Sequence, residues 1–426
     1  MLTTITLILE LIVKWFLKDI ALNDSTKNIV DLGMILVLFI AFCADIAKSK
    51  KTKYAQIPLI LGTLFRIALV IFDIFGRSIY VLPNSAGDSE MFYANAVEFV
   101  ASHHTVRGAF PAVMGTLFSV IGTSRLYGQF LLAMCSVLSL CILAWLLNQI
   151  NIDMRVKYTI MMITALLPNL AIISSLFLRE SIVAMFISLS FFLFYKWTEN
   201  GTHSCLVLSF VSAFLASRFH SGSIAIVMGY IAIILLYDRK ASSFRFRAKN
   251  LISSLLLVFV VAFLYTNYSD TLFGKMSNVD SIEDIAKTTI TGGSSYAQYV
   301  GNSSNPLSMA LYTIPRIVYF LYSPFPWQWR GISDIIAFVF SSLFFLATTW
   351  SVYRYFKRGD KSNRTLVLTL VIVTMCAAFV FAWGTSNTGT AVRHRDKMTI
   401  IWALMLALTY RSTNSRKYSE NNTMKI

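Results

Sequence analysis

Apolar runs of about 15 to 22 residues recur along the whole chain and are separated by short polar segments. A helix needs about 20 mostly apolar residues to cross a bilayer, so these runs predict transmembrane helices. They lack the alternation of apolar and polar residues that marks barrel strands. Because only helices and closed barrels span lipid, the pattern predicts an all-α polytopic membrane protein.

The pattern predicts about twelve transmembrane helices, in a range of about ten to thirteen, and each boundary carries an error of a few residues. Basic residues cluster after several apolar runs, which is typical of cytoplasmic loops. The clusters lie at 48–53, 239–249, 354–364 and 411–425. The spans are expected at 4–20, 29–47, 55–75, 126–148, 158–177, 181–197, 204–217, 222–237, 250–266, 333–353, 365–383 and 397–410.

The basic clusters also predict the sidedness of the loops. Counting 109–122 as a span would place a basic cluster on the outer side, and this segment is short for a crossing. We therefore expect a re-entrant or interfacial helix there, and a second interfacial helix at 308–323. The expected organisation is a single transmembrane domain over 1–410 with both chain ends cytoplasmic, outer loops at 76–125, 267–332 and 384–396, and a cytoplasmic tail at 411–426.

Composition agrees with a membrane protein and narrows the function. Of the 426 residues, 56% are hydrophobic and 14% are charged, whereas a soluble domain carries about 25% charged residues. The net charge of +16 comes largely from lysines and arginines at the ends of apolar runs. This placement explains the charge by topology and argues against a nucleic-acid partner. The five cysteines lie inside apolar segments without metal-ligand spacing, so we predict no disulfide framework.

Carboxylates and histidines gather on the predicted outer side. Asp88 and Glu90 stand at the start of an amphipathic helix, where the helix dipole favours anions. Asp88 is interpreted either as a helix cap or as a general base. Glu180 begins a span just after a helix broken by Pro168, and His220 lies in an outer turn.

Arginines on the outer side oppose the positive-inside tendency and therefore need a reason. Bidentate binding of phosphate is a good one. We predict diphosphate contacts from Arg179, Arg218, Arg316, Arg393 and Arg395. The predicted catalytic residues are Asp88, Glu90, Glu180 and His220, and further contacts are expected from Arg107, His394 and Trp327. No metal ligand set is predicted, and no nucleotide-binding or hydrolase motif occurs in the sequence.

The outer polar motifs resemble those of a known group. Asp88-Ser89-Glu90 before an amphipathic helix resembles the first-loop acidic motif of the GT-C membrane glycosyltransferases. The Pro168-Asn169 helix before Arg179-Glu180, the Arg218 to Gly222 turn and Arg393-His394-Arg395 resemble bacterial O-antigen, capsule and exopolysaccharide repeat-unit polymerases (Wzy-like). The resemblance covers about 80 to 410. The chain departs from it in the 267–305 loop, which has no arginine.

The resemblance implies an inverting glycosyl transfer from undecaprenyl diphosphate onto a lipid-linked repeat unit, at the outer face of the bacterial cytoplasmic membrane. It implies no cofactor, and its partners would be the undecaprenyl-linked glycan, membrane lipid, and a chain-length regulator and flippase of the same pathway. Two alternatives stay open. One is a GT-C transferase that uses a polyprenyl-phosphate sugar donor and a divalent metal. The other is a flippase or transporter of lipid-linked oligosaccharides.

Overall fold

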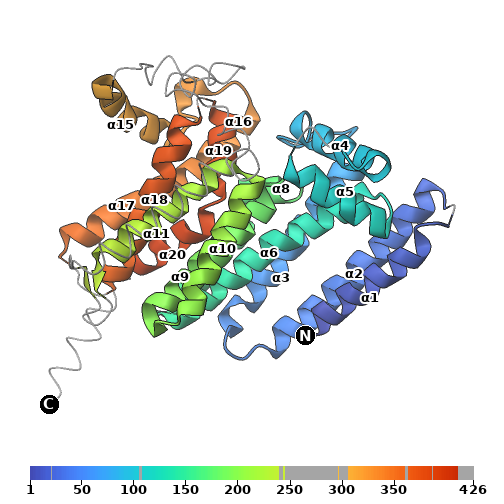
Figure 1. The fold of residues 1–426 in the computed structure, drawn as a ribbon, viewed down its shortest axis with the longest axis horizontal. Coiled ribbons are helices and arrows are strands. Elements are labelled where there is room, and N and C mark those ends of the chain that lie inside the picture. The colour runs from blue at the N-terminus through green and yellow to red at the C-terminus, as the bar shows by residue number, and fades with distance from the viewer. Residues whose placement is uncertain are drawn as a thin grey trace.

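The computed structural model is almost entirely helical (Figure 1). It describes residues 1–20, 22–104, 108–238, 243–244, 296, 306–359, 363–385 and 387–410, with backbone alone for 306–310. The first elements are α1 (Leu2–Leu17), α2 (Asp24–Lys48), η1 (Lys53–Ala55), α3 (Gln56–Phe75), α4 (Asp88–Ser102), α5 (Ala109–Ile121), α6 (Arg125–Gln149), α7 (Met154–Leu166), α8 (Pro168–Ser174), α9 (Glu180–Asn200), α10 (His203–Phe219), η2 (Ser221–Ile224) and α11 (Ala225–Leu236). The later elements are β1 (Tyr237–Asp238), β2 (Ser243–Phe244), α15 (Pro306–Tyr322), η4 (Pro326–Gln328), α16 (Ile332–Ile336), η5 (Ala337–Ser342), α17 (Leu343–Lys357), α18 (Arg364–Trp383), α19 (Thr388–Asp396) and α20 (Thr399–Thr409).

Several of these helices are long and apolar enough to cross a membrane. Within the described residues there are 6, and up to 7 if the bent pair α7–α8 is one span. This confirms the prediction of an all-α, multi-pass membrane protein. The predicted spans 4–20, 204–217, 222–237 and 397–410 fall on shorter helices, and 250–266 lies outside the described residues. Twelve crossings therefore stays a prediction.

The segment expected to be re-entrant or interfacial forms a short helix, α5, of 13 residues. At 1.5 Å per residue it is about 20 Å long, which is less than the ~30 Å hydrocarbon core. Helix α15 likewise covers the second predicted interfacial segment. The predicted outer loop 267–305 lies outside the described residues except for Tyr296.

A broken helix in the middle of the bundle is held together by a buried arginine. Helices α7 and α8 meet at an angle of 50° next to Pro168, which has no N–H to continue the helix. Arg66 of α3 is fully buried, and its Nη1 donates to the Ala165 carbonyl at 2.8 Å, while Nε donates to Ser174 Oγ at 3.1 Å. The guanidinium therefore binds both halves of the broken helix and satisfies polar groups that lipid would leave unpaired.

Two apolar clusters position the polar end of the bundle. The largest core joins α6, α7, α9, α11, α18 and α20. A second cluster packs the short helices α4 and α5 onto the link between α8 and α9, with Phe92 against Phe110 at 5.3 Å and Phe110 against Phe177 at 5.6 Å between ring centroids. Figure 1 shows α4, α5, α8 and α19 at the same end of the long helices. The loop helices thus cover one end of the bundle.

Candidate functional site

The candidate site forms where three separate segments of the chain meet at this end of the bundle. Asp88 begins α4 after Gly87, whose φ of 65° lies in the left-handed region that glycine tolerates. Glu180 begins α9, and Arg393 lies near the end of α19. Helix α19 is fixed at its start by Asn387, whose side chain accepts from the Gly389 N–H at 2.9 Å.

Arg393 bridges two carboxylates. Its Nη1 lies 2.7 Å from Asp88 Oδ2 and its Nη2 lies 2.8 Å from Glu180 Oε1. The Glu180 side chain is 3% exposed, whereas that of Asp88 is 46% exposed. Burial alone would lower the pKa of the Arg393 guanidinium, but the two carboxylates outweigh it and raise that pKa above its ordinary value. The arginine is therefore fully charged and ties α4, α9 and α19 together.

Cations outnumber carboxylates in this cluster. Lys397 is fully buried, with Nζ 3.9 Å from Glu180 Oε1, and Arg179 lies with its guanidinium carbon 5.5 Å from the centroid of the Phe92 ring. When Lys397 is protonated and the histidines are neutral, Arg179, Arg393 and Lys397 against Asp88 and Glu180 give one surplus positive charge; the full burial of Lys397 opposes that charge, and an anion bound beside it would favour it. Three buried nitrogens of the cluster have no hydrogen-bond partner among the described residues: Arg179 Nε, Arg393 Nε and Lys397 Nζ. The cluster thus has donors and charge available for an anion.

Two histidines pair directly beside these cations. His220 Nε2 and His394 Nε2 are 3.0 Å apart, and His394 Nδ1 lies 3.1 Å from Thr385 Oγ1. Gly222 permits this approach, because a Cβ at that position would lie 2.8 Å from the Phe381 ring, against which both imidazoles pack. Burial, with Lys397 next in weight, holds the pKa of each imidazole well below its ordinary value. Both rings are therefore neutral at pH 7, and one Nε2–H donates to the other.

The open end of this histidine chain is a single atom. His220 Nδ1 is buried and has no hydrogen-bond partner in the described part of the chain. If the Thr385 hydroxyl donates to His394 Nδ1, then His394 Nε2–H donates to His220 Nε2, and His220 Nδ1 carries a hydrogen and is a donor. If His394 Nδ1–H instead donates to Thr385, then His220 Nε2–H donates to His394, and His220 Nδ1 is an acceptor. The pair can therefore present either a proton or a lone pair to a ligand.

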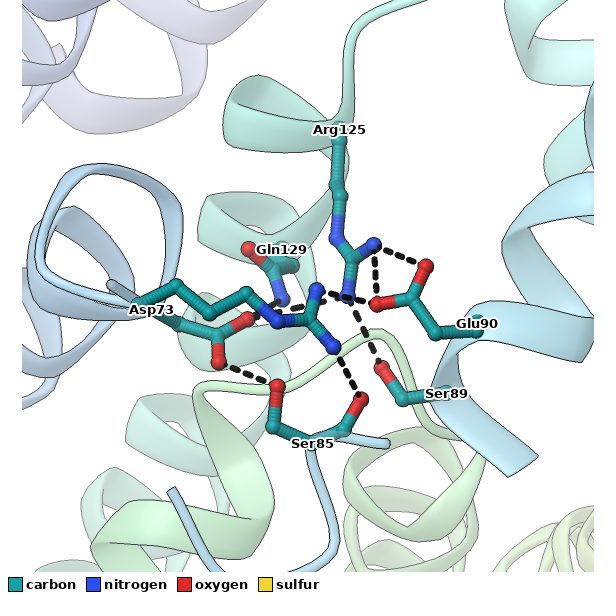
Figure 2. Close-up of polar contacts among 7 residues, drawn as sticks. Asp73, Ser85, Ser89, Glu90, Arg125 and Gln129 are labelled. Atoms are coloured by element: carbon teal, nitrogen blue, oxygen red, sulfur yellow. Dashed lines mark hydrogen bonds and ion pairs between the residues drawn. The ribbon is translucent and has the colours of Figure 1, made fainter. Parts of the chain in front are cut away.

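Glu90 belongs to a different cluster from Asp88, although only one residue separates them. Residues two apart point to nearly opposite sides of a helix. Glu90 accepts from Arg125 Nη1 at 2.7 Å and contacts Arg77. Figure 2 shows Arg125 between Glu90 and Asp73, with Ser85 and Gln129 on the Asp73 carboxylate.

The contacts of Glu90 indicate a structural role for this residue. Partial burial would raise the pKa of its carboxyl, but Arg125 and Arg77 hold it below its ordinary value. Glu90 is thus a doubly paired carboxylate that fastens α4 to the start of α6. This geometry does not suit the predicted role as a base, since two guanidinium groups occupy its oxygens.

Arg395, predicted to bind diphosphate, is instead surrounded by protein. Its side chain is fully buried, and Nη1 donates to the carbonyls of Phe320, Leu321 and Ser323 at 3.3, 3.0 and 2.5 Å. The remaining nitrogens donate to Ser341 and Ser342 at 3.0 Å each, in the π-helical turn η5. All of its nitrogens are used inside the protein, so we leave Arg395 out of the site.

The other predicted contacts are spread out. Arg218 is exposed on α10, and Arg316 is buried with its guanidinium carbon 4.3 Å from the centroid of the Trp383 ring. Trp327 is 63% exposed and stacks on Phe325 at 4.7 Å. Arg107 lies outside the described residues. The structure therefore brings together Asp88, Arg179, Glu180, His220, Arg393 and His394 from the predicted set.

Sequence reasoning missed several residues of these clusters. Lys397 follows Arg393-His394-Arg395-Asp396 directly, and its position four residues after Arg393 was the available signal. Arg66 and Arg125 lie within or at the start of apolar runs, where a charge is costly without a partner. Among the described residues, no group of three or more His, Cys, Asp or Glu side chains is arranged to hold a metal ion.

Comparison with known proteins gives no relative from which a function can be transferred. No protein-family model matches the chain, and neither a curated protein nor a solved structure gives a match.

Proposed function

We propose that this protein is a membrane glycosyltransferase that polymerises lipid-linked oligosaccharide repeat units, with Arg393 and its neighbours binding the lipid diphosphate. The observation that carries the proposal is the cation surplus around Arg393, with the buried, unpartnered nitrogens of Arg179, Arg393 and Lys397. A diphosphate offers several acceptor oxygens and more than one negative charge, which matches these donors. A neutral sugar alone would leave the surplus charge without a counterion.

The proposed topology has about twelve crossings with both chain ends in the cytoplasm. The basic clusters at 48–53, 239–249, 354–364 and 411–425 support this orientation. In that orientation the Arg393 cluster faces the outer side of the bacterial cytoplasmic membrane. Nucleotide sugars are cytoplasmic donors, so an outer-face enzyme needs a donor that is carried by a lipid.

In the proposed reaction, the acceptor hydroxyl oxygen forms a bond to the anomeric carbon of the donor sugar. The bond from that carbon to the diphosphate oxygen breaks, and its electron pair leaves with the lipid diphosphate. Arg393, Arg179 and Lys397 stabilise the charge that develops on the leaving oxygen. The acceptor hydroxyl attacks the face of the anomeric carbon opposite the leaving diphosphate, which inverts the anomeric configuration, and its proton moves to a carboxylate.

Asp88 suits the role of that base best. It is the more exposed carboxylate of the cluster, and one oxygen is bound by Arg393. A diphosphate that binds Arg393 competes for the same N–H groups and releases this oxygen for the acceptor hydroxyl. Glu180 is buried and stays with Arg393, so it orients the guanidinium. The His220–His394 pair is neutral and donates or accepts a hydrogen bond at the sugar.

Deletion of the gene, followed by electrophoresis of lipid-linked glycans, tests this function. Complementation with the wild type should restore a polymer ladder, whereas Arg393→Lys should accumulate single repeat units at normal membrane abundance. Arg155→Lys, at an exposed residue on α7, is the matched control and should restore the ladder. A glycan that lacks one sugar would instead indicate the GT-C transferase. Repeat units retained on the cytoplasmic side would indicate a flippase and contradict the proposal.

A further inference from the structure

A second group of basic residues lies apart from the Arg393 cluster, at the junction of α1, α2 and α6. It lines a pocket of about 90 Å³. Lys14 and Lys18 come from the end of α1, Lys27 comes from the first turns of α2, and Ser124 precedes α6. Asp31 is the one carboxylate in the lining. The pocket therefore combines three ammonium groups with a single acid.

The acid of the pocket is already occupied. Asp31 Oδ1 lies 2.6 Å from Lys14 Nζ, and the other oxygen accepts from the Ser124 hydroxyl. Lys18 has only a long contact of 3.4 Å to the Ser119 carbonyl, and neither Lys18 nor Lys27 has an ion pair with a described carboxylate. Two positive charges are thus left at the pocket mouth, where the N-terminal ends of α2 and α6 meet the C-terminal ends of α1 and α5, so the helix dipoles largely offset one another and the lysines supply the positive charge.

The size and the surroundings of the pocket indicate which anion fits. Pockets that enclose a whole small molecule have about 300–1,000 Å³, so this one accepts only a small head group. Beside it, the outer surface is apolar: Trp15, Phe16 and Ile29 are 48%, 66% and 68% exposed. Lys18 Nζ lies 6.0 Å from the Trp15 ring centroid. An aromatic and apolar rim around a basic pocket is typical of a membrane interface.

We propose that this pocket binds the phosphate of an anionic phospholipid, with the acyl chains along the exposed faces of α1 and α2. The phosphate contacts Lys18 and Lys27, while Lys14 is held in place by Asp31. Arg125 directly follows Ser124 and binds Glu90 of α4, so the pocket lies at the same end of the bundle as the Arg393 cluster. Only the assignment of the lipid to the outer leaflet rests on the proposed function.

The position of Trp15 allows a test that does not depend on enzyme activity. The protein is placed in nanodiscs with equal fractions of phosphatidylglycerol and phosphatidylcholine, one of them brominated on its acyl chains. The emission of Trp15 is obtained by subtracting the fluorescence of Trp15→Phe from that of the wild type. We expect brominated phosphatidylglycerol to quench this difference at least twofold more than brominated phosphatidylcholine. Equal quenching by the two lipids overturns the proposal.

Variants and free phosphate identify the source of the preference. The double variant Lys18→Gln/Lys27→Gln should abolish the stronger quenching by brominated phosphatidylglycerol. Neither side chain belongs to the buried Lys14–Asp31 ion pair, so we expect the fold to be retained. Lys50→Gln/Lys51→Gln removes the same charge elsewhere and should leave the preference intact. A loss in both double variants overturns the site. Inorganic phosphate at 10 mM (about the concentration that a weak anion site needs) should not remove the preference; if it does, the pocket is a free-phosphate site and the lipid assignment is wrong.

Discussion

Two arginines of the same short helix have opposite surroundings. Arg395 is fully buried and donates to three backbone carbonyls and two serine hydroxyls. Arg393, two residues earlier, bridges Asp88 and Glu180 and keeps a buried Nε without a partner. One guanidinium is saturated by neutral protein groups, and the other lies among charges that a ligand can rearrange. An arginine at this end of the bundle is therefore either a structural clamp or a binding group, and its partners decide which.

Arg395→Ala should have the largest effect on stability. The substitution leaves carbonyls and hydroxyls buried without a donor, which costs about 3–5 kcal/mol. We expect the melting temperature in detergent to fall by at least about 5 °C. Arg218→Ala, at an exposed arginine of α10, serves as the control and should change stability by less than about 0.5 kcal/mol. Equal effects of the two variants would show that Arg395 is not a clamp.

Asp88 and Glu90, two carboxylates of α4, extend the same comparison to activity. Under the proposed function, Asp88→Asn should reduce polymerisation by about 100-fold or more, because the proposed base is lost. Glu90→Gln should keep activity within about threefold and reduce stability by roughly 1 kcal/mol, because it loosens the contacts with Arg77 and Arg125. Rates measured with purified lipid-linked repeat units distinguish the two. A larger loss of rate in Glu90→Gln would reverse the assignment of the base.

The sequence predicted more of the fold than of these roles. The period and length of the apolar runs locate most helices, because burial in lipid needs long apolar segments whatever they pack against. The sequence placed Asp88, Glu180 and Arg393 at one polar end, and the structure brings them into contact, whereas their roles stay predictions. Their partners were not predictable: Arg393 and Asp88 are 305 residues apart, and Arg395 differs from Arg393 only in the tertiary contacts of α19.

A double-mutant cycle measures how strongly Arg393 and Glu180 depend on each other. Arg393→Gln leaves a buried carboxylate with fewer partners and should destabilise the protein by about 3 kcal/mol. Addition of Glu180→Gln should recover at least about 1 kcal/mol of this loss. The Arg330–Asp334 pair, with side chains that are 52% and 19% exposed and 3.6 Å apart, is the control, and its coupling should stay below about 0.5 kcal/mol. Additive effects in the first cycle would argue against a functional ion pair.

The histidine pair contributes to stability in a way that depends on pH. Because the folded-state pKa of His220 and of His394 lies well below 6.5, the unfolded chain binds more protons at mildly acidic pH. Stability should therefore be complete above pH 6.5 and decrease as the pH falls, by up to roughly 1.4 kcal/mol per histidine and pH unit. His220→Gln/His394→Gln should flatten the melting temperature between pH 7 and 5.5 (from about half a unit above to about one unit below the unfolded pKa). The same slope in wild type and variant would contradict neutral buried rings.

Binding of a polyprenyl diphosphate to the purified protein tests the central claim most directly. Polyprenyl monophosphate of the same chain length is the matched ligand, and Arg179→Gln is the variant, because Arg179 has an open donor and no carboxylate within ion-pair distance in the described part of the chain. We predict that the diphosphate binds at least about tenfold more tightly than the monophosphate, a difference of about 1.4 kcal/mol, and that Arg179→Gln removes most of this preference. Equal affinity for both lipids, unchanged in Arg179→Gln, would contradict the account.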